Sequence, residues 1–111
     1  AEGQLMRDFT FVDDTVAAVV KLSRSEAWSG ATVVNVGHHR PVSVNTFVQT
    51  LADRLGMAPV VQHAPMQKAD VALTCASEDR LLSMIDQWPD TPLASGLGQF
   101  VQWLQQWDPL P

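Results

Sequence analysis

Three histidines and one cysteine are the side chains of this sequence whose types suit a metal ion or a nucleophilic step. Imidazole and thiolate are good zinc ligands, so His38, His39, His63 and Cys75 raise the question of a zinc site. Adjacent histidines rarely point at one ion, however, and no CxxC or HxxxH spacing is present. Nothing near Cys75 indicates an activated thiolate. We therefore expect no metal site and no cysteine nucleophile.

Two neighbouring carboxylates, Asp13 and Asp14, resemble a candidate pair for acid/base chemistry. They stand directly before Val16, Val19 and Val20, whose spacing is that of one helix face. A carboxylate in this position accepts hydrogen bonds from the first free amides of a helix. We therefore interpret the pair as a helix N-cap, and we assign no catalytic residue.

The length and composition are those of a single domain of ordinary size. The chain has 111 residues, 7 basic against 12 acidic, and a formal net charge of −5, which disfavours nucleic-acid binding. The longest apolar run, residues 16–20, is far shorter than a membrane span. No signal peptide is visible at the start. These features predict a cytoplasmic protein without membrane contact, and a single cysteine excludes an internal disulfide.

Apolar spacing and turn residues predict an α/β (α+β) fold, in which short strands alternate with about four helices. Short strands are expected over residues 7–12, 32–36 and 59–63. The clearest helix begins at the N-cap Ser43 and ends at Gly56. Three further helices are expected: one capped by Asp13 or Asp14 and ending near residue 24, one capped by Ser77, and one opening at Thr91 and Pro92 and ending before Pro109.

The whole sequence, residues 1–111, is predicted to be a single domain. Met6 is a candidate start, in which case residues 1–5 are upstream or vector-derived. The alternative is that the sequence begins inside a longer gene, and the residues do not separate the two.

Four short stretches carry a resemblance over nearly the whole chain. They are RDFTFVDD at residues 7–14, NVGHHRPV at 35–42, PMQKADVALTCA at 65–76 and TPLASG at 91–96, followed by an aromatic-rich helix. In order and separation they resemble the C-terminal, substrate-binding lobe of the NAD-dependent epimerase/dehydratase family, the extended short-chain dehydrogenases. The closest branch is that of the UDP-glucuronate epimerases.

The resemblance also implies what this sequence does not encode. In such enzymes an N-terminal Rossmann part holds NAD on a Gly-rich turn and carries a catalytic tyrosine and lysine. This sequence has no tyrosine, and its glycines never form GxxGxxG or GxGxxG. We therefore expect the N-terminal Rossmann part to be absent from these residues, and we expect no cofactor and no enzyme activity from them alone.

The resemblance implies a nucleotide-sugar site. By position Arg7 would bind the diphosphate, Asp70 would accept from the ribose hydroxyls, and Gln67 would lie near the phosphates. The sequence departs from the family's pattern here. Lys68 and Ala69 stand where the family has the proline and glycine before Asp70, and Cys75, Ala76 and Ser77 stand where it has tyrosine, alanine and aspartate.

Plainer roles remain open for the same residues. Arg7 is also explained by an ion pair with Asp8, Asp13 or Asp14, and Asp70 by a solvated loop carboxylate.

The resemblance also predicts a surface that lacks its cover. Without the Rossmann part, apolar surface is left exposed, and a homo-oligomer or a partner protein is expected to cover it. Four tryptophans at 28, 88, 103 and 107 are either a stacking surface or, for at least half of them, core. Three functional hypotheses follow: a non-catalytic substrate lobe with weak nucleotide-diphosphate-sugar binding, a protein-interaction module, or one half of a split epimerase completed by a separate Rossmann chain.

Overall fold

The computed structural model describes residues 3–108 of the chain. Within them lie four helices and one antiparallel two-stranded sheet, in the order β1 (Met6–Arg7), α1 (Val12–Ser23), β2 (Val42–Ser43), α2 (Val44–Leu55), α3 (Asp79–Met84) and α4 (Leu93–Trp107). In the sheet Met6 lies opposite Ser43 and Arg7 opposite Val42. The expected α/β class with four helices is therefore confirmed.

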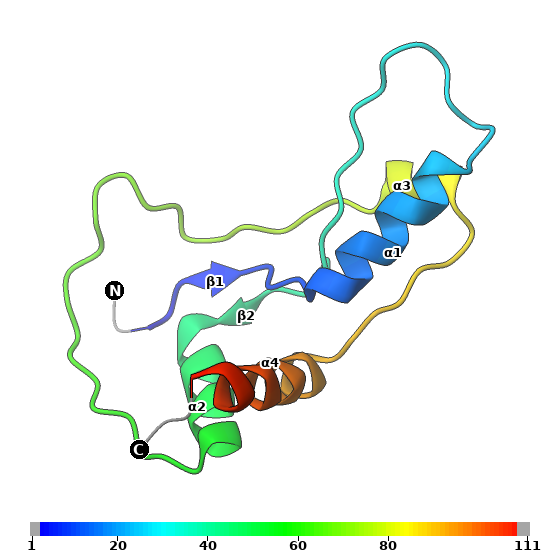
Figure 1. Cartoon of the computed structure of the whole chain (residues 1–111). Coiled ribbons are helices and arrows are strands. Elements are labelled where there is room, and N and C mark those ends of the chain that lie inside the picture. The colour runs from blue at the N-terminus through cyan, green and yellow to red at the C-terminus, as the bar shows by residue number, and fades with distance from the viewer. Residues whose placement is uncertain (1–2, 109–111) are drawn as a thin grey trace.

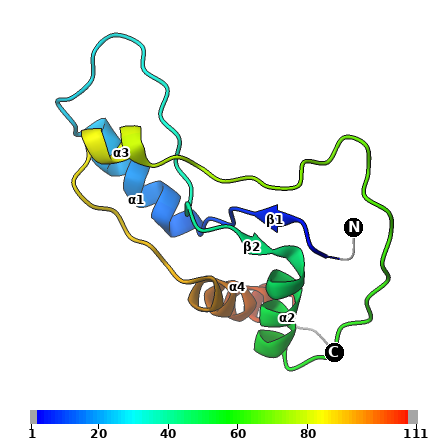
Figure 2. The same ribbon diagram turned by 180° about the vertical axis from the view of Figure 1, so that it is seen from behind.

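The elements form two groups joined by the small sheet. Figure 1 and the reverse view in Figure 2 show α1 and α3 side by side in an arm at one end, and α2 and α4 packed together at the other. The long connections, residues 24–41 and 56–78, loop outward from these groups. The molecule measures 49 × 37 × 18 Å, so it is elongated and thin.

The arm has its own small core, built on an unexpected face of α1. Ala18 and Leu22 are buried against Leu81 and Ile85, and residues 34 and 36 pack beside them. The predicted apolar face was wrong: the valines at 16, 19 and 20 are exposed, as is the valine at 12 in the first turn. The small Ala18 side chain allows a neighbouring element to approach α1 closely, which the bulkier valines would prevent.

The helix C-termini follow the sequence, since α1 ends at Ser23 and α4 at Trp107, close to the predicted ends. The Ser43 hydroxyl accepts the Thr46 N–H (3.0 Å), and Gly56 ends α2 with a left-handed φ of 67°, so both predicted ends are confirmed. The other predicted caps were wrong. No side-chain cap is present at the start of α1, α3 or α4, whose N-cap residues are Phe11, Glu78 and Pro92 in place of the expected aspartates, serine and threonine.

Asp14 has a different role from the one expected. It is 1% exposed, in the first turn of α1, and its two oxygens accept hydrogen bonds from the N–H and the hydroxyl of Thr91, each 2.7 Å long. Asp14 therefore joins the start of α1 to the segment before α4.

Two of the predicted strands are not strands in the described residues, and the third is displaced. Residues 32–36 and 59–63 have no ladder partner there, and the strand expected at 7–12 is reduced to Met6–Arg7. A strand requires a neighbour to accept and donate its backbone hydrogen bonds, so β-forming residues alone do not make one.

The described chain exposes more surface than a compact domain of its size. Its radius of gyration is 16.8 Å, whereas about 13 Å is typical of a compact domain near 100 residues. Its accessible surface is 7894 Å², whereas a compact 12.2 kDa monomer exposes about 6,100 Å². None of the helices within residues 3–108 is both long enough and apolar enough to cross a bilayer.

Candidate functional site

The sheet fastens a distant loop beside the candidate phosphate-binding arginine. The Met6 N–H donates to the Ala72 carbonyl (2.9 Å), and the Thr74 N–H donates to the Met6 carbonyl (3.2 Å). These bonds make a parallel bridge between Met6 and Leu73. The loop that carries residues 67–70 is therefore held next to Arg7, although about sixty residues of chain separate them.

Arg7 is anchored on one side and paired on the other. Its Nη1 donates to the carbonyls of Met6 (2.8 Å) and Val71 (2.9 Å), which fixes the guanidinium against the loop. Its Nη2 lies 3.8 Å from Asp70 Oδ1, an ion-pair distance that is longer than a hydrogen bond. The ion pair that the structure shows for Arg7 is thus with Asp70 and not with the neighbouring acids that the sequence left open.

Gln67 and Asp70 are the ends of one tight turn. The Asp70 N–H donates to the Gln67 carbonyl (3.0 Å), with Lys68 and Ala69 between them. The three residues assigned by resemblance therefore come together: two through the turn, and Arg7 through its contact with Asp70. Lys68, inside this turn, is a further cationic residue of the same segment.

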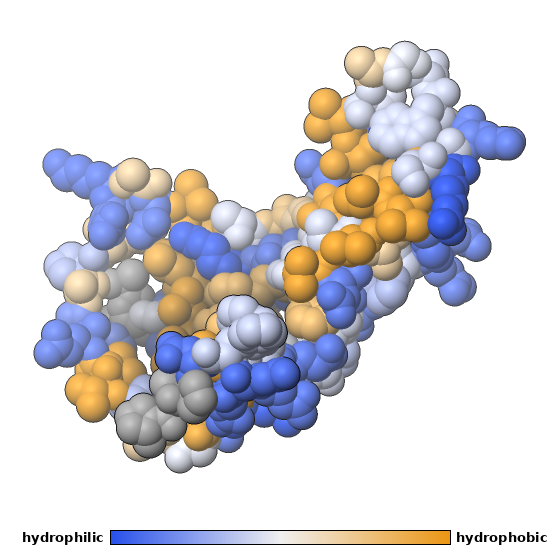
Figure 3. Space-filling model, viewed as in Figure 1, coloured by the Kyte–Doolittle hydropathy of each residue, from blue (hydrophilic) through white to orange (hydrophobic). Residues whose placement is uncertain are grey.

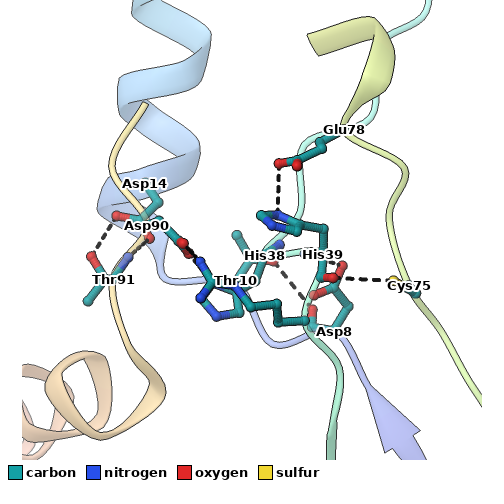
Figure 4. Close-up of polar contacts among 10 residues, drawn as sticks. Asp8, Thr10, Asp14, His38, His39, Cys75, Glu78, Asp90 and Thr91 are labelled. Atoms are coloured by element: carbon teal, nitrogen blue, oxygen red, sulfur yellow. Dashed lines mark hydrogen bonds and ion pairs between the residues drawn. The ribbon is translucent and has the colours of Figure 1, made fainter. Parts of the chain in front are cut away.

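Asp8 is the residue of this region that sequence reasoning missed. Its Oδ2 accepts the backbone N–H of His39 (3.1 Å) and of Ala76 (2.8 Å), as Figure 4 illustrates for the His39 side. Gly37 allows this approach, because a Cβ there would lie 2.8 Å from Asp8 Oδ2. One carboxylate beside Arg7 thus ties three chain segments together. No local pattern predicts this role, because its partners lie far along the chain.

The two adjacent histidines point at different carboxylates. His38 Nδ1 lies 2.9 Å from Asp90 Oδ1, and His39 Nδ1 lies 2.9 Å from Glu78 Oε2 (Figure 4). Arg40 also pairs with Asp90. Burial, followed by the positive charge of Arg40, holds the pKa of His38 below its ordinary value of 6.5, so the ring is neutral at physiological pH. These contacts cross-link the segments that join the two groups of helices.

The candidate zinc ligands are not brought together. Across residues 3–108 no three His, Cys, Asp or Glu side chains are placed to hold a metal ion. His63 lines a separate open pocket of about 600 Å³ between α2 and the loop that follows it. Cys75 is exposed, and its thiol lies 3.7 Å from the His39 carbonyl.

Comparisons with known proteins find relatives that match more than nine tenths of the chain. A probable UDP-glucuronate 4-epimerase of Rhizobium meliloti is 36% identical over 95% of this chain, and the protein CapI of Staphylococcus aureus is 35% identical over 91%. The chain spans only 36% and 35% of these two relatives, which is about a third of their length. No family model matches the sequence.

Solved structures agree with the sequence relatives. The structure of MoeE5 in complex with UDP-glucuronic acid and NAD matches with a TM-score of 0.84 and 31% identity, over 96% of this chain and 35% of that one. A UDP-glucuronic acid 4-epimerase from Bacillus cereus, in complex with NAD, matches in fold with a TM-score of 0.82 at 20% identity, over 97% of this chain and 33% of that one. The expected resemblance to the C-terminal part of such proteins is confirmed.

Proposed function

From this similarity to the C-terminal part of UDP-glucuronate epimerase-like proteins, we propose that these 111 residues bind a nucleotide-diphosphate sugar and do not turn it over. One observation carries the proposal: Arg7 is held by two backbone carbonyls directly beside the turn of residues 67–70.

The chemistry of this neighbourhood suits a diphosphate and a ribose. A guanidinium makes paired hydrogen bonds to phosphate oxygens, and Lys68 adds a second positive charge to the turn that contacts Arg7. The Asp70 carboxylate, with 41% of its side chain exposed, is able to accept from hydroxyl groups. A bound diphosphate would take over the role of counter-ion to Arg7. Asp70 would then be released from its 3.8 Å contact to bind the ribose.

The absence of turnover follows from the residue inventory. The sequence contains no tyrosine, so it lacks the phenolic base that the family uses to take the sugar hydroxyl proton. It also has no Gly-rich turn after a strand, where the NAD pyrophosphate would meet backbone amides. We therefore propose that these residues are not catalytic by themselves.

Titration of the protein with UDP-glucuronate and with UDP, followed by two-dimensional NMR, tests this proposal. We expect the amide signals of Arg7, Gln67 and Asp70 to shift in a saturable manner. The variant Arg7→Gln should weaken binding by about tenfold or more, because it removes a charge-assisted contact. The variant Arg24→Gln, an exposed arginine at the end of α1, is the matched control. Equal binding by both variants, or no shift at millimolar ligand, contradicts the proposal.

A second candidate function, protein interaction, is favoured by the exposed face of α1. Its four valines at 12, 16, 19 and 20 form a helical stripe, and Figure 3 shows hydrophobic atoms gathered over α1 and the chain beside it. Residues 32–36 run nearby without a strand partner among the described residues. The excess surface, about 1,800 Å² above that of a compact monomer, exceeds what one partner buries in an interface of standard size.

We propose that a partner protein or a second copy covers this α1 face. In the split-epimerase version the partner is a separate NAD-binding Rossmann chain. Mixing the protein with such a chain and assaying UDP-glucuronate epimerisation tests that version. The variant Val16→Glu should abolish complex formation, whereas Val60→Glu, on an exposed loop, should not. If no Rossmann chain forms a complex, and Val16→Glu leaves self-association unchanged, the α1 face is not an interface.

A further inference from the structure

Helix α4 differs from the rest of the molecule in its lack of charge. None of its fifteen residues, Leu93–Trp107, is Asp, Glu, Lys or Arg, although the chain as a whole has 19 such residues. The polar positions of α4 are filled mainly by glutamines at 99, 102, 105 and 106, all exposed. A surface helix of an acidic protein normally carries charges on its outer face, so a neutral outer face requires an explanation.

The outer face of α4 carries a row of exposed aromatic rings. Phe100, Trp103 and Trp107 recur at helical spacing and are 43%, 55% and 71% exposed. The rings of Phe100 and Trp103 are tilted against each other, with centroids 6.0 Å apart. The opposite face of the helix, with Leu97 and Val101 buried, already packs on α2. Core packing therefore does not account for Trp103 and Trp107, whereas Trp88 packs against the core of the arm.

A small apolar cavity opens beside the same row. It has a volume of about 270 Å³ and lies where the segment before α1 meets the first half of α4. Phe100 lines it together with Phe9, Phe11 and Phe47, and the rings of Phe9 and Phe47 are stacked with centroids 4.2 Å apart. One copy of the chain therefore presents both a protruding indole, Trp107, and an aromatic cavity two helical turns away from it.

We propose that α4 is a self-association surface, on which two copies of this chain pair antiparallel about a two-fold axis at Trp103. Such an interface is isologous, so each residue of one copy meets its counterpart across the axis. Trp103 then faces Trp103 of the second copy. Trp107 meets Gln99 and Phe100 of the second copy and covers the mouth of its cavity.

The charges of the molecule favour a second copy over other occupants. Two copies that each carry a net charge of −5 repel one another, and this repulsion is smallest where the contacting surface is uncharged. An anionic membrane or a nucleic acid would require lysines and arginines, and α4 has none. Glutamines at the rim can form side-chain hydrogen bonds across the axis without burying a charge. This interface lies on α4 and does not depend on the proposed nucleotide site.

Sedimentation velocity over a wide range of protein concentration tests the proposal. The unchanged protein should form a dimer that is strengthened by added salt, because salt screens the repulsion between the two acidic copies. Trp103→Glu and Trp103→Lys should each weaken the dimer by about tenfold or more, since like charges then face each other across the axis. An equimolar mixture of the two variants should associate again as a mixed dimer. Val60→Glu is the matched control, at an exposed position outside α4, and should dimerise normally.

Several outcomes would overturn the proposal. A monomer at every concentration excludes the dimer, and a Trp103→Glu variant that dimerises normally excludes α4 as its site. Failure of the mixed variants to associate excludes the two-fold axis at Trp103. Far-UV circular dichroism of each variant shows whether it is folded, and fluorescence of Trp107→Phe reports the burial of that indole independently of charge. If the emission shift on dimerisation persists unchanged in Trp107→Phe, Trp107 does not cover the cavity of the second copy.

Discussion

Removal of the Asp14 carboxylate is the sharpest test of how the two groups of helices are joined. Asp14 is 1% exposed and accepts both hydrogen bonds that Thr91 donates, at 2.7 Å each. The variant Asp14→Ala loses both bonds and leaves the two Thr91 donors without their acceptor. The contact joins residues 77 positions apart in the chain, so its loss should destabilise the whole fold and not one helix end.

The size of the effect follows from the number and kind of bonds. Each hydrogen bond to a charged group contributes about 1.5–3 kcal/mol, and the two bonds end on the two oxygens of one carboxylate, so Asp14→Ala should lower the free energy of unfolding by about 3 kcal/mol. Thr91→Ala removes only the hydroxyl bond and should cost about half as much. Asp13→Ala is the matched control: this neighbour is exposed, and the loss of its interaction with the helix dipole costs at most about 0.5–1 kcal/mol.

Urea unfolding followed by far-UV circular dichroism measures these differences. The double variant Asp14→Ala/Thr91→Ala should be more stable than the sum of the single losses predicts, by about 1 kcal/mol, because both changes break the same contact. If Asp13→Ala destabilises the protein as much as Asp14→Ala does, the pair acts as a helix cap after all. Additive losses in the double variant would likewise refute the contact.

Three further substitutions test other contacts that stabilise the fold. Gly37→Ala places a methyl group 2.5 Å from the Ala76 Cβ, so the backbone must shift, and thermal unfolding should show a loss of about 1–3 kcal/mol. Because the pKa of His38 is lowered in the folded state, the unfolded state binds the proton more readily, and stability should fall as the pH drops below about 6.5; in His38→Gln, denaturant midpoints should fall less over this range. Ser43→Ala removes the cap on the Thr46 amide and should cost about 1 kcal/mol in a urea titration, and an unchanged midpoint would contradict the cap.

Local chemistry was predictable from the sequence. Ser43 and Gly56 mark the ends of α2 correctly, because each acts on amides or backbone angles within a few residues. The family motifs, likewise, were sufficient to bring Arg7, Gln67 and Asp70 into one hypothesis, and the structure places them in one neighbourhood. The part of the site that holds Arg7 in place was not predictable, because the carbonyl of Val71 and the bridge to β1 depend on tertiary contacts.

The face that a helix buries could not be predicted from apolar spacing alone. In α1 two helical stripes compete, one of valines and one of Asp14, Ala18 and Leu22, and the exposed stripe has more branched apolar side chains than the buried one. Periodicity counts the valines as core because they are the more hydrophobic. Packing instead selects the stripe whose small Ala18 lets Leu81 approach, with Asp14 satisfied by hydrogen bonds.

The predicted strands at residues 32–36 and 59–63 do not form because, as with the buried face of α1, tertiary neighbours decide the outcome. Residues 32–36 alternate between half-buried and exposed positions, which is the pattern of a strand at the edge of a sheet. No neighbouring strand in the described chain forms backbone hydrogen bonds with them. Strand propensity expresses a fit to a neighbouring strand and to a surface, so it is realised only where both are present. The prediction of a strand at residues 32–36 is therefore wrong for the described chain. The proposal that a partner covers the neighbouring α1 face would give these residues a neighbour. On this argument, amide hydrogen exchange at residues 33–36 should slow when a partner covers α1. Exchange at these amides should remain fast in a dimer formed only through α4. One exchange measurement therefore distinguishes an interface on α1 from an interface on α4.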